Sequence, residues 1–225
     1  MDAAFIIDLF LHLDKYLNVL LSQYNTLAYF LIFVVLFIET GLVFTPFLPG
    51  DSLIFVTGAI AAAGGPINIP VMLALMYAAA VGGDTANYHI GSALRGKVER
   101  KEHVPLLKYE YLERTQGFFD RHGGKTITIA RFVPIVRTFA PFVAGVCRMP
   151  YRRFLHFNVI GGLSWVTAFF LFGYWFGNID YIQQHFGLVV VAIVLISVLP
   201  AVIAYIAGKL KKNSSGPVMT KGPEE

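Results

Sequence analysis

Long apolar segments recur along this 225-residue chain, and several of them are interrupted by proline or glycine. A run of roughly 17–25 apolar residues is long enough to cross a bilayer core of about 30 Å. Hydrophobic residues make up 56% of the chain and charged residues only 14%, whereas soluble domains carry about 25% charged residues. The sequence therefore predicts an all-α polytopic membrane protein in which residues 1–212 form a single membrane domain.

Four segments have the length and composition of membrane-crossing helices: 27–45, 70–94, 154–177 and 186–208. Residues 4–22 are different, because their three charged residues fall on one face of a helical pattern whose other face is apolar. A helix of that kind lies in the membrane interface rather than across the bilayer. The last residues are rich in serine, glycine and proline, so the segment 213–225 is expected to be a disordered cytoplasmic tail.

Two further apolar segments carry proline breaks. The first, 52–63, follows Pro46 and Pro49 and is too short to cross a membrane. The second, 126–147, contains Pro134 and Pro141. Broken apolar segments of this kind are typical of re-entrant elements, whose loose backbone is tolerated only where protein or a wet cavity covers it.

Lysine and arginine are unevenly distributed, and their placement sets the expected orientation in the membrane. Of the 18 basic residues, eight lie in 95–125 and four in the C-terminal tail, whereas the connections 64–69 and 178–185 have none. Placing the basic regions in the cytoplasm also places both chain termini there. One broken segment then enters from outside and the other from inside, so the chain is predicted to be an inverted-repeat helical bundle. Broken segments at matching positions in two halves indicate a transporter's binding site.

Four charged residues fall in or beside the broken segments: Glu39, Asp51, Arg131 and Arg137. A charge at the bilayer centre costs at least ~2.5–3.5 kcal/mol on insertion scales, so these side chains must pair or face water. In one interpretation they form two buried ion pairs that hold the halves together, although such pairs add little net stability. In the other, they line a polar cavity where the arginines bind an anion, because a guanidinium matches phosphate oxygens.

Asp84 is a fifth candidate, since it lies near the middle of a predicted crossing helix. Together with Glu39 and Asp51 it could couple transport to protons, or it could simply belong to a polar helix face near the inner interface. Trp165 is expected to pack in the bundle or anchor it at the membrane. Gly161 and Gly162 are expected to let two helices approach closely.

Several classes of function lack their sequence signatures. The single cysteine, Cys147, and the scattered histidines offer no metal-ligand spacing, so neither a metal nor a cofactor is expected. The chain contains no G-x-S-x-G, H-E-x-x-H or P-loop motif, which argues against an enzyme and against ATP as an energy source. The net charge of +4 does not indicate a nucleic-acid partner, because the basic residues lie where membrane topology places them. The glycine-rich helix would permit a homo-oligomer.

Two long motifs closely resemble the hallmarks of the DedA family, whose members share the VTT or "SNARE-associated" domain. They are residues 37–52, FIETGLVFTPFLPGDS, and residues 130–145, ARFVPIVRTFAPFVAG. The resemblance covers roughly residues 5–210 and implies a bacterial inner-membrane protein that supports envelope integrity, cell division and resistance to cationic peptides. Members are implicated in returning undecaprenyl phosphate across the membrane and in scrambling phospholipids, with dependence on the proton motive force.

The acidic pair and the arginine pair that matter in DedA relatives match Glu39, Asp51, Arg131 and Arg137. The resulting expectation is a lipid translocase whose arginines bind the phosphate of a polyprenyl phosphate or phospholipid. Its acids would hold the arginines between cycles or bind protons. The alternatives are a proton-coupled transporter of a small ion or solute and a membrane scaffold for envelope maintenance.

Overall fold

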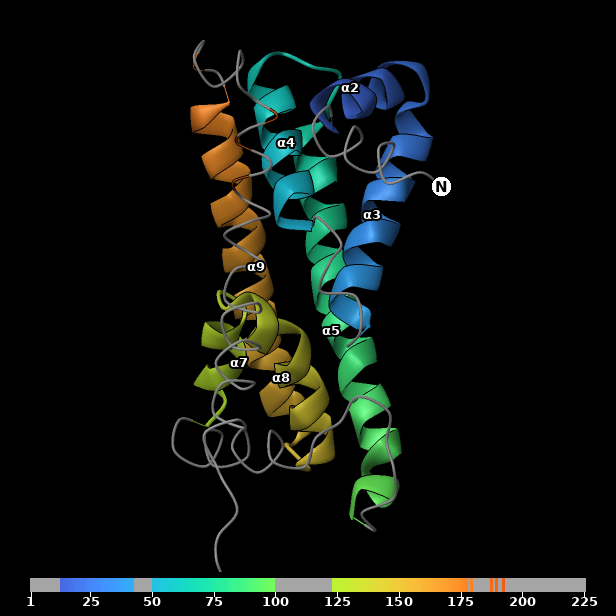
Figure 1. Ribbon diagram of the computed structural model, residues 1–225, viewed down its shortest axis with the longest axis vertical. Coiled ribbons are helices and arrows are strands. Elements are labelled where there is room, and N and C mark those ends of the chain that lie inside the picture. Colours follow the sequence, from blue (N-terminus) through green and yellow to red (C-terminus); the bar gives the residue numbers. More distant parts are fainter. Residues whose placement is uncertain are drawn as a thin grey trace, which may run out of the picture.

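The structure is a computed structural model that describes residues 13–42, 50–99 and 123–177, together with positions 179, 187, 189 and 192. Within these residues the ordered elements are all helical, which confirms the predicted all-α class. The helices shown in Figure 1 are α2 (Leu13–Gln23), α3 (Asn25–Gly41), α4 (Gly50–Ala62), α5 (Ile69–Glu99), α7 (Lys125–Ala130), α8 (Pro134–Val146) and α9 (Tyr151–Phe176).

Two of these helices are long and apolar enough to cross a membrane: Ile69–Gly96 within α5, and Tyr151–Phe176, which is α9. They correspond to the predicted crossings 70–94 and 154–177, and they run in opposite directions along the bundle (Figure 1). The predicted crossing 186–208 lies almost entirely outside the described residues, and the tail 213–225 lies wholly outside them.

The outer surface of the bundle is apolar over much of its length. Phe30, Phe172 and Trp175 are each more than half exposed, at 60%, 52% and 63%. Soluble monomers rarely display large contiguous apolar patches, whereas hydrocarbon is a favourable surrounding for such side chains. The exposed aromatic residues therefore agree with the membrane setting that hydropathy predicts.

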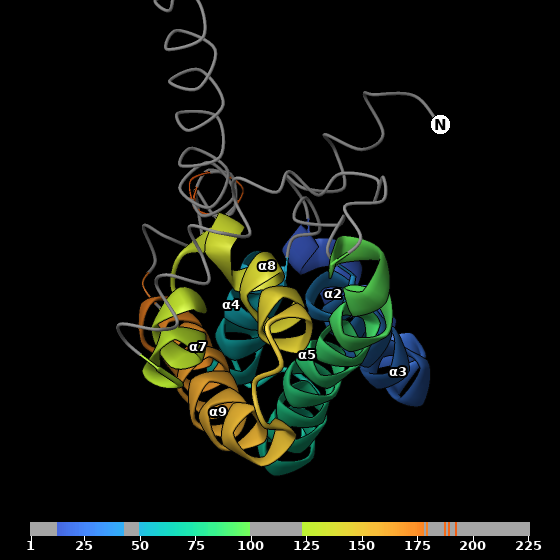
Figure 2. The same cartoon turned by 90° about the horizontal axis from the view of Figure 1, so that it is seen from below.

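The helices α4 and α8 each occupy about half of the bundle, and they lie in opposite halves (Figure 1). α4 packs against α9, and α8 packs against α5, so a long helix supports each half-length one. Viewed along the axis, α3 flanks α5 on one side and α7 flanks α9 on the other (Figure 2). The half-length helices therefore come from opposite ends of the bundle, while their insertion into a bilayer and the inverted repeat stay predictions.

The path of α3 differs from the crossing that the sequence predicts for 27–45. The start of α3 lies beside the α4–α5 connection, where the Asn68 backbone N–H donates to the Tyr29 hydroxyl at 2.7 Å. α3 then runs inward, and Gly50 at the start of α4 lies against the Glu39 carboxylate near its end. Thus α3 and α4 form a hairpin that enters and leaves at one end of the bundle, rather than a crossing followed by a separate dip.

The end of α3 thus lies beside the start of α4, while the path of the chain across a membrane stays a prediction. Residues 1–12 lie outside the described residues, as does the C-terminus. The cytoplasmic placement of both termini therefore stays a prediction.

α2 lies across the end of the bundle at a steep angle to α3 (Figure 1). Its Leu17 and Leu21 are buried against the core, whereas Lys15, Asn18 and Ser22 are exposed. Tyr16 and Val19 are also exposed, so the outward face of α2 mixes polar and apolar side chains. The interfacial location predicted for 4–22 stays a prediction.

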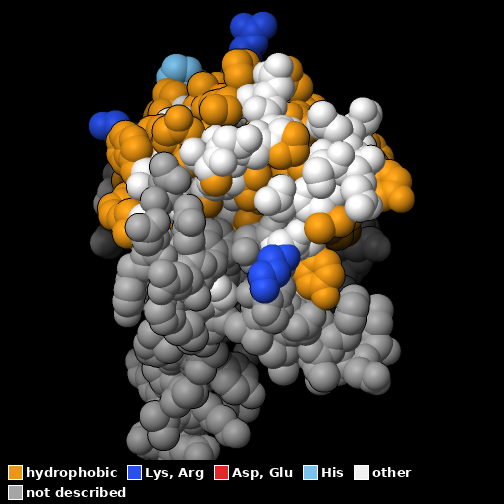
Figure 3. Space-filling model, turned by 90° about the horizontal axis from the view of Figure 1, so that it is seen from above, with side chains coloured by type: hydrophobic (Ala, Val, Ile, Leu, Met, Phe, Trp, Pro, Cys, Tyr) orange, Lys and Arg blue, Asp and Glu red, His pale blue; other side chains and the backbone are white. Residues whose placement is uncertain are grey.

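The two ends of the bundle differ in charge. The end with α2 and the uncharged α4–α5 connection shows mainly apolar and other uncharged atoms in its described part, with few basic side chains (Figure 3). The opposite end carries five basic residues near the ends of α5, α7, α8 and α9, namely Arg95, Lys125, Arg148, Arg152 and Arg153. This difference in charge is the one expected if the end with the five basic residues faces the cytoplasm.

Glycines bring the half-length helices close to the long ones. A Cβ at Gly58 on α4 would overlap the backbone of α9, and a Cβ at Gly173 on α9 would overlap the backbone of α4. Gly91 on α5 and Gly145 on α8 oppose the partner backbone in the same reciprocal way. Small residues permit this approach, which membrane helices use because apolar burial alone gives them little reason to associate.

Arg95 on α5 fixes the end of α8. Its Nε donates to the Val146 carbonyl at 3.1 Å, and its Nη2 donates to the Gly145 carbonyl at 2.6 Å. The last carbonyls of a helix have no partner within that helix, so one guanidinium satisfies two of them and adds a favourable charge at the C-terminus.

We expect Arg95→Gln to lower the free energy of unfolding by about 1.5 kcal/mol, since hydrogen bonds to a charged group contribute about 1.5–3 kcal/mol. Thermal unfolding of the purified protein in detergent measures this change. Arg95→Lys, which keeps the charge but loses the forked geometry, should recover only part of it. An Arg95→Gln variant that melts at the parent temperature would show that α8 does not depend on this cap.

Candidate functional site

The five charged residues that the sequence singles out meet near the middle of the bundle. Glu39, Asp51, Asp84, Arg131 and Arg137 are all buried, none with more than 5% of its surface exposed. They come from α3, α4, α5, the end of α7 and the first turn of α8. The α3–α4 hairpin, a second hairpin formed by α7 and α8 in the opposite half of the bundle, and the long helix α5 therefore bring their charged side chains into one cluster.

Arg137 binds two carboxylates of the α3–α4 hairpin. Its Nη2 lies 2.5 Å from Glu39 Oε1, and its Nη1 lies 2.7 Å from Asp51 Oδ1. Asp51 lies in the first turn of α4, where the helix dipole favours a negative charge. The pairing that the sequence leaves open is therefore settled here, because both acids of the first motif contact the same arginine of the second.

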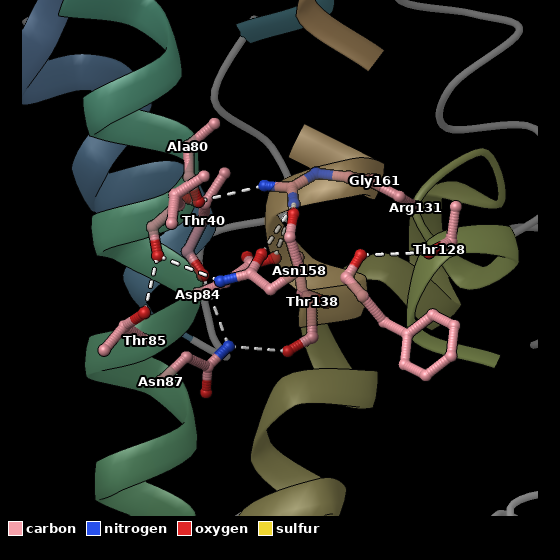
Figure 4. A network of polar contacts seen from close by, with 12 residues as sticks. Thr40, Ala80, Asp84, Thr85, Asn87, Thr128, Arg131, Thr138, Asn158 and Gly161 are labelled. Atoms are coloured by element: carbon pink, nitrogen blue, oxygen red, sulfur yellow. Dashed lines mark hydrogen bonds and ion pairs between the residues drawn. The ribbon is translucent and has the colours of Figure 1, made fainter. Parts of the chain in front are cut away.

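Arg131 pairs with Asp84 instead. Its Nη1 lies 2.9 Å from Asp84 Oδ2 and donates to Asn158 Oδ1 at 2.8 Å (Figure 4). Nη1 also donates to the Asn158 carbonyl at 3.2 Å, and Nη2 donates to the Ala80 carbonyl at 2.9 Å. These partners belong to α5 and α9, so Arg131 attaches the end of α7 to both long helices.

Trp165 on α9 lies beside both arginines and is fully buried. Its ring centroid is 4.8 Å from Cζ of Arg137 and 5.5 Å from Cζ of Arg131. Its Nε1 donates to Asp51 Oδ1 at 2.9 Å. A desolvated cation over a tryptophan ring contributes about 2 kcal/mol or more, so Trp165 belongs to the charged cluster, not to a membrane anchor or to apolar packing alone.

The substitution Trp165→Phe tests the indole N–H separately from the ring. We expect it to lower the free energy of unfolding by about 2 kcal/mol, because a hydrogen bond to a buried carboxylate is lost while an aromatic face remains. Chemical or thermal unfolding in detergent measures the change. Trp175→Phe is the matched control, since Trp175 is 63% exposed on the same helix. Equal effects of the two substitutions would contradict a special role for Trp165.

Two buried asparagines complete the network, and neither had been given a role from the sequence. Asn87 Nδ2 on α5 donates to the Thr138 carbonyl at 2.8 Å and to the Thr40 carbonyl at 3.3 Å, so it bridges α3 and α8 (Figure 4). Asn158 Nδ2 on α9 donates to the Val81 carbonyl at 3.0 Å. An amide inside an otherwise apolar crossing helix is the signal that could have identified both, because polar groups at that depth need partners.

The cluster is not fully satisfied within the described part of the chain. Glu39 Oε2, Asp84 Oδ1 and the Nε atoms of Arg131 and Arg137 are buried and have no hydrogen-bond partner there. Three acids also face only two arginines in this cluster. A surplus buried acid with a free oxygen is a candidate proton-binding group, because an unpaired charge at this depth is costly. The described residues include no group of His, Cys, Asp and Glu arranged to hold a metal ion.

Comparison with known proteins identifies the family. A family model for the VTT domain matches residues 48–175, which is more than half of the chain. The chain belongs to the DedA family of VTT-domain proteins. Protein DedA of Escherichia coli strain K12 is 48% identical to it over 206 residues, which cover 91% of this chain and 94% of that protein. The resemblance seen in the motifs is thereby confirmed.

Other DedA-family relatives are also named as membrane proteins. The "Uncharacterized membrane protein Rv0364" of Mycobacterium tuberculosis is 40% identical over 174 residues, covering 77% of this chain and 76% of that protein. The "Inner membrane protein YghB" of Escherichia coli strain K12 is 38% identical over 160 residues, covering 71% and 73%. No solved structure matches the chain. This DedA-family chain is therefore a membrane protein whose matched domain contains every site residue except Glu39.

Proposed function

We propose that this DedA-family protein is a lipid translocase that moves a phosphate-bearing lipid, undecaprenyl phosphate or a phospholipid, across the bacterial inner membrane. The observation that carries the proposal is the position of Arg137, whose two terminal nitrogens are each bound by a carboxylate where two hairpins meet. Phosphate oxygens fit the same guanidinium fork as carboxylate oxygens. A lipid headgroup that reaches the hairpins can therefore exchange with Glu39 and Asp51.

The surface beside the arginines suits an amphipathic ligand. Phe132 and Val133 follow Arg131 directly and are 52% and 40% exposed, and Val136, which precedes Arg137, is 39% exposed. Apolar side chains thus face outward within a residue or two of the buried guanidinium groups. A lipid would keep its tails against these residues while only its phosphate enters the cluster.

The acids supply the counter-charge between cycles. When Glu39 or Asp51 takes up a proton, its attraction for Arg137 falls and the guanidinium becomes available to a phosphate. Glu39 Oε2, which has no partner in the described residues, is a free acceptor for that proton. Asp84 provides a third acid in the same cluster. After the lipid leaves, the site would return to its starting orientation as the acid releases its proton on the other side of the membrane.

The test is lipid transfer in proteoliposomes that contain the purified full chain. Labelled undecaprenyl phosphate and labelled phosphatidylethanolamine are assayed separately, with and without a proton gradient, and undecaprenol is the matched lipid without phosphate. We expect transfer of at least one phosphate-bearing lipid and none of undecaprenol. Absence of transfer of both phosphate-bearing lipids under every gradient would contradict the proposal.

A proton-coupled transporter of a small ion or solute is the second candidate, and the surplus of acids over arginines favours it. It predicts substrate-dependent pH changes in the same liposomes without lipid movement. A membrane scaffold is the third, and the triple substitution Glu39→Gln, Asp51→Asn and Arg137→Gln separates it from both transporters, because no buried charge around Arg137 is left without its partner. A scaffold keeps its role in cells after this change, whereas a translocase loses its phosphate-binding group.

A further inference from the structure

We infer that the two buried arginines are inequivalent: Arg137 exchanges its carboxylates for the lipid phosphate, whereas Arg131 has a structural role and keeps its contacts to α5 and α9. The inference rests on the proposed function and assigns its phosphate contact to one of two arginines that the sequence motif treats alike. It departs from the expectation that both guanidinium groups bind the phosphate.

The contacts of Arg131 are of a kind that a ligand cannot easily replace. Two of its acceptors are backbone carbonyls, Ala80 on α5 and Asn158 on α9, and these oxygens are held in place by their helices. Moving the guanidinium away would break both hydrogen bonds and leave buried N–H donors that need new partners, which is unfavourable away from water. The side chains of Asn158 and Asp84 also contact Nη1 of Arg131.

The packing around Arg131 also holds it in one position. A Cβ at Gly162 would lie 3.2 Å from Arg131 Nη1, and one at Gly161 would lie 3.5 Å from its Cδ. These two glycines of α9 therefore make room for the arginine, which refines the helix-packing role that the sequence predicts for them. Thr128, one turn before Arg131, donates its hydroxyl to the Phe157 carbonyl at 2.9 Å and ties α7 to α9.

The described ion-pair partners of Arg137 are both carboxylate side chains. Carboxylates can rotate away or take up a proton, and a phosphate offers equivalent oxygens, so this set of partners is replaceable. Asp51 Oδ1 accepts from both Arg137 and Trp165. When Arg137 turns to a ligand, the indole N–H remains on that oxygen, so the carboxylate keeps a hydrogen bond throughout the exchange.

Trp165 provides the readout, because its ring lies beside both guanidinium groups and the chain has only one other tryptophan. The parent protein for the test is the full chain with Trp175→Phe, purified in detergent. Its tryptophan fluorescence is titrated with farnesyl phosphate, a short phosphate-bearing polyprenyl lipid, and with farnesol as the lipid without phosphate. The half-saturating concentration and the melting temperature are measured for each variant.

We expect a saturable fluorescence change with farnesyl phosphate and none with farnesol. Arg137→Lys should raise the half-saturating concentration at least tenfold, since a lysine cannot bind phosphate through a fork. Arg131→Lys should leave the half-saturating concentration within twofold while it lowers the melting temperature by several degrees. If Arg131→Lys does not fold, the charge-neutral pair Arg131→Gln with Asp84→Asn takes its place with the same expectation.

The inference is overturned if the Arg131 variant weakens binding as much as Arg137→Lys does. It is also overturned if binding is insensitive to Arg137→Lys. A parent protein that gives no response to farnesyl phosphate would overturn the proposed phosphate-binding function and this inference with it, so the two failures are distinguishable.

Discussion

Replacement of Arg137 by glutamine is expected to abolish lipid transfer and to lower the free energy of unfolding by about 3–5 kcal/mol. The cost arises because Glu39 and Asp51, both buried, lose the cation that each contacts within 2.7 Å. Removing one partner of a buried ion pair leaves the other charge uncompensated, and that desolvated charge accounts for most of the loss. Thermal unfolding in detergent and transfer in proteoliposomes measure the two effects separately.

The matched control removes the whole cluster of charges around that arginine. A triple variant with Glu39→Gln, Asp51→Asn and Arg137→Gln has no unpaired charge there, so it should recover most of the stability that Arg137→Gln loses. Lipid transfer should remain absent, because the group that binds phosphate is still missing. A triple variant that transfers lipid at the parent rate would show that the cluster only holds the hairpins together.

Gly91→Ala is expected to lower the free energy of unfolding by about 3 kcal/mol, at the upper end of what overpacking usually costs. A Cβ at Gly91 would meet the backbone of α8, with Phe142 C at 2.9 Å and Phe142 Cα at 3.1 Å. Backbone cannot rotate away as a side chain can, so α8 must move outward and carry Arg137 with it. The free energy of unfolding and the rate of lipid transfer should therefore both fall in this variant.

Gly82→Ala is the control on the same helix. Its nearest neighbour would be the Phe37 ring at 3.4 Å, which is an ordinary van der Waals distance. Alanine is also the better helix former by about 1 kcal/mol in a helix interior. This variant should be as stable as the parent or slightly more so. If the two alanine variants lose stability equally, the close α5–α8 crossing is not what makes Gly91 necessary.

The long helices could be predicted from the sequence, because hydropathy along a segment depends only on residues within that segment. The predicted crossings 70–94 and 154–177 correspond to α5 and α9 within a few residues at each end. The proline and glycine breaks likewise mark the segments that become α4 and α8. Glu39, Asp51, Arg131 and Arg137 stand out in the sequence, with Asp84 as a fifth candidate, because an ionised group in an apolar segment is too costly to be incidental.

How these parts meet could not be predicted in the same way, because it depends on contacts between distant segments. An apolar run such as 27–45 has the same composition whether it crosses the bundle or turns back. The hydropathy pattern therefore could not predict the α3–α4 hairpin. The partners of the site are far apart in the chain: Asp51 contacts Arg137 86 residues later and Trp165 114 residues later. Such contacts depend on which helices pack together, and the packing depends on where opposed glycines such as Gly91 and Gly145 let backbones touch. Local residue pattern therefore determined which side chains matter, whereas helix packing decided that one arginine faces two carboxylates and the other is held by backbone carbonyls.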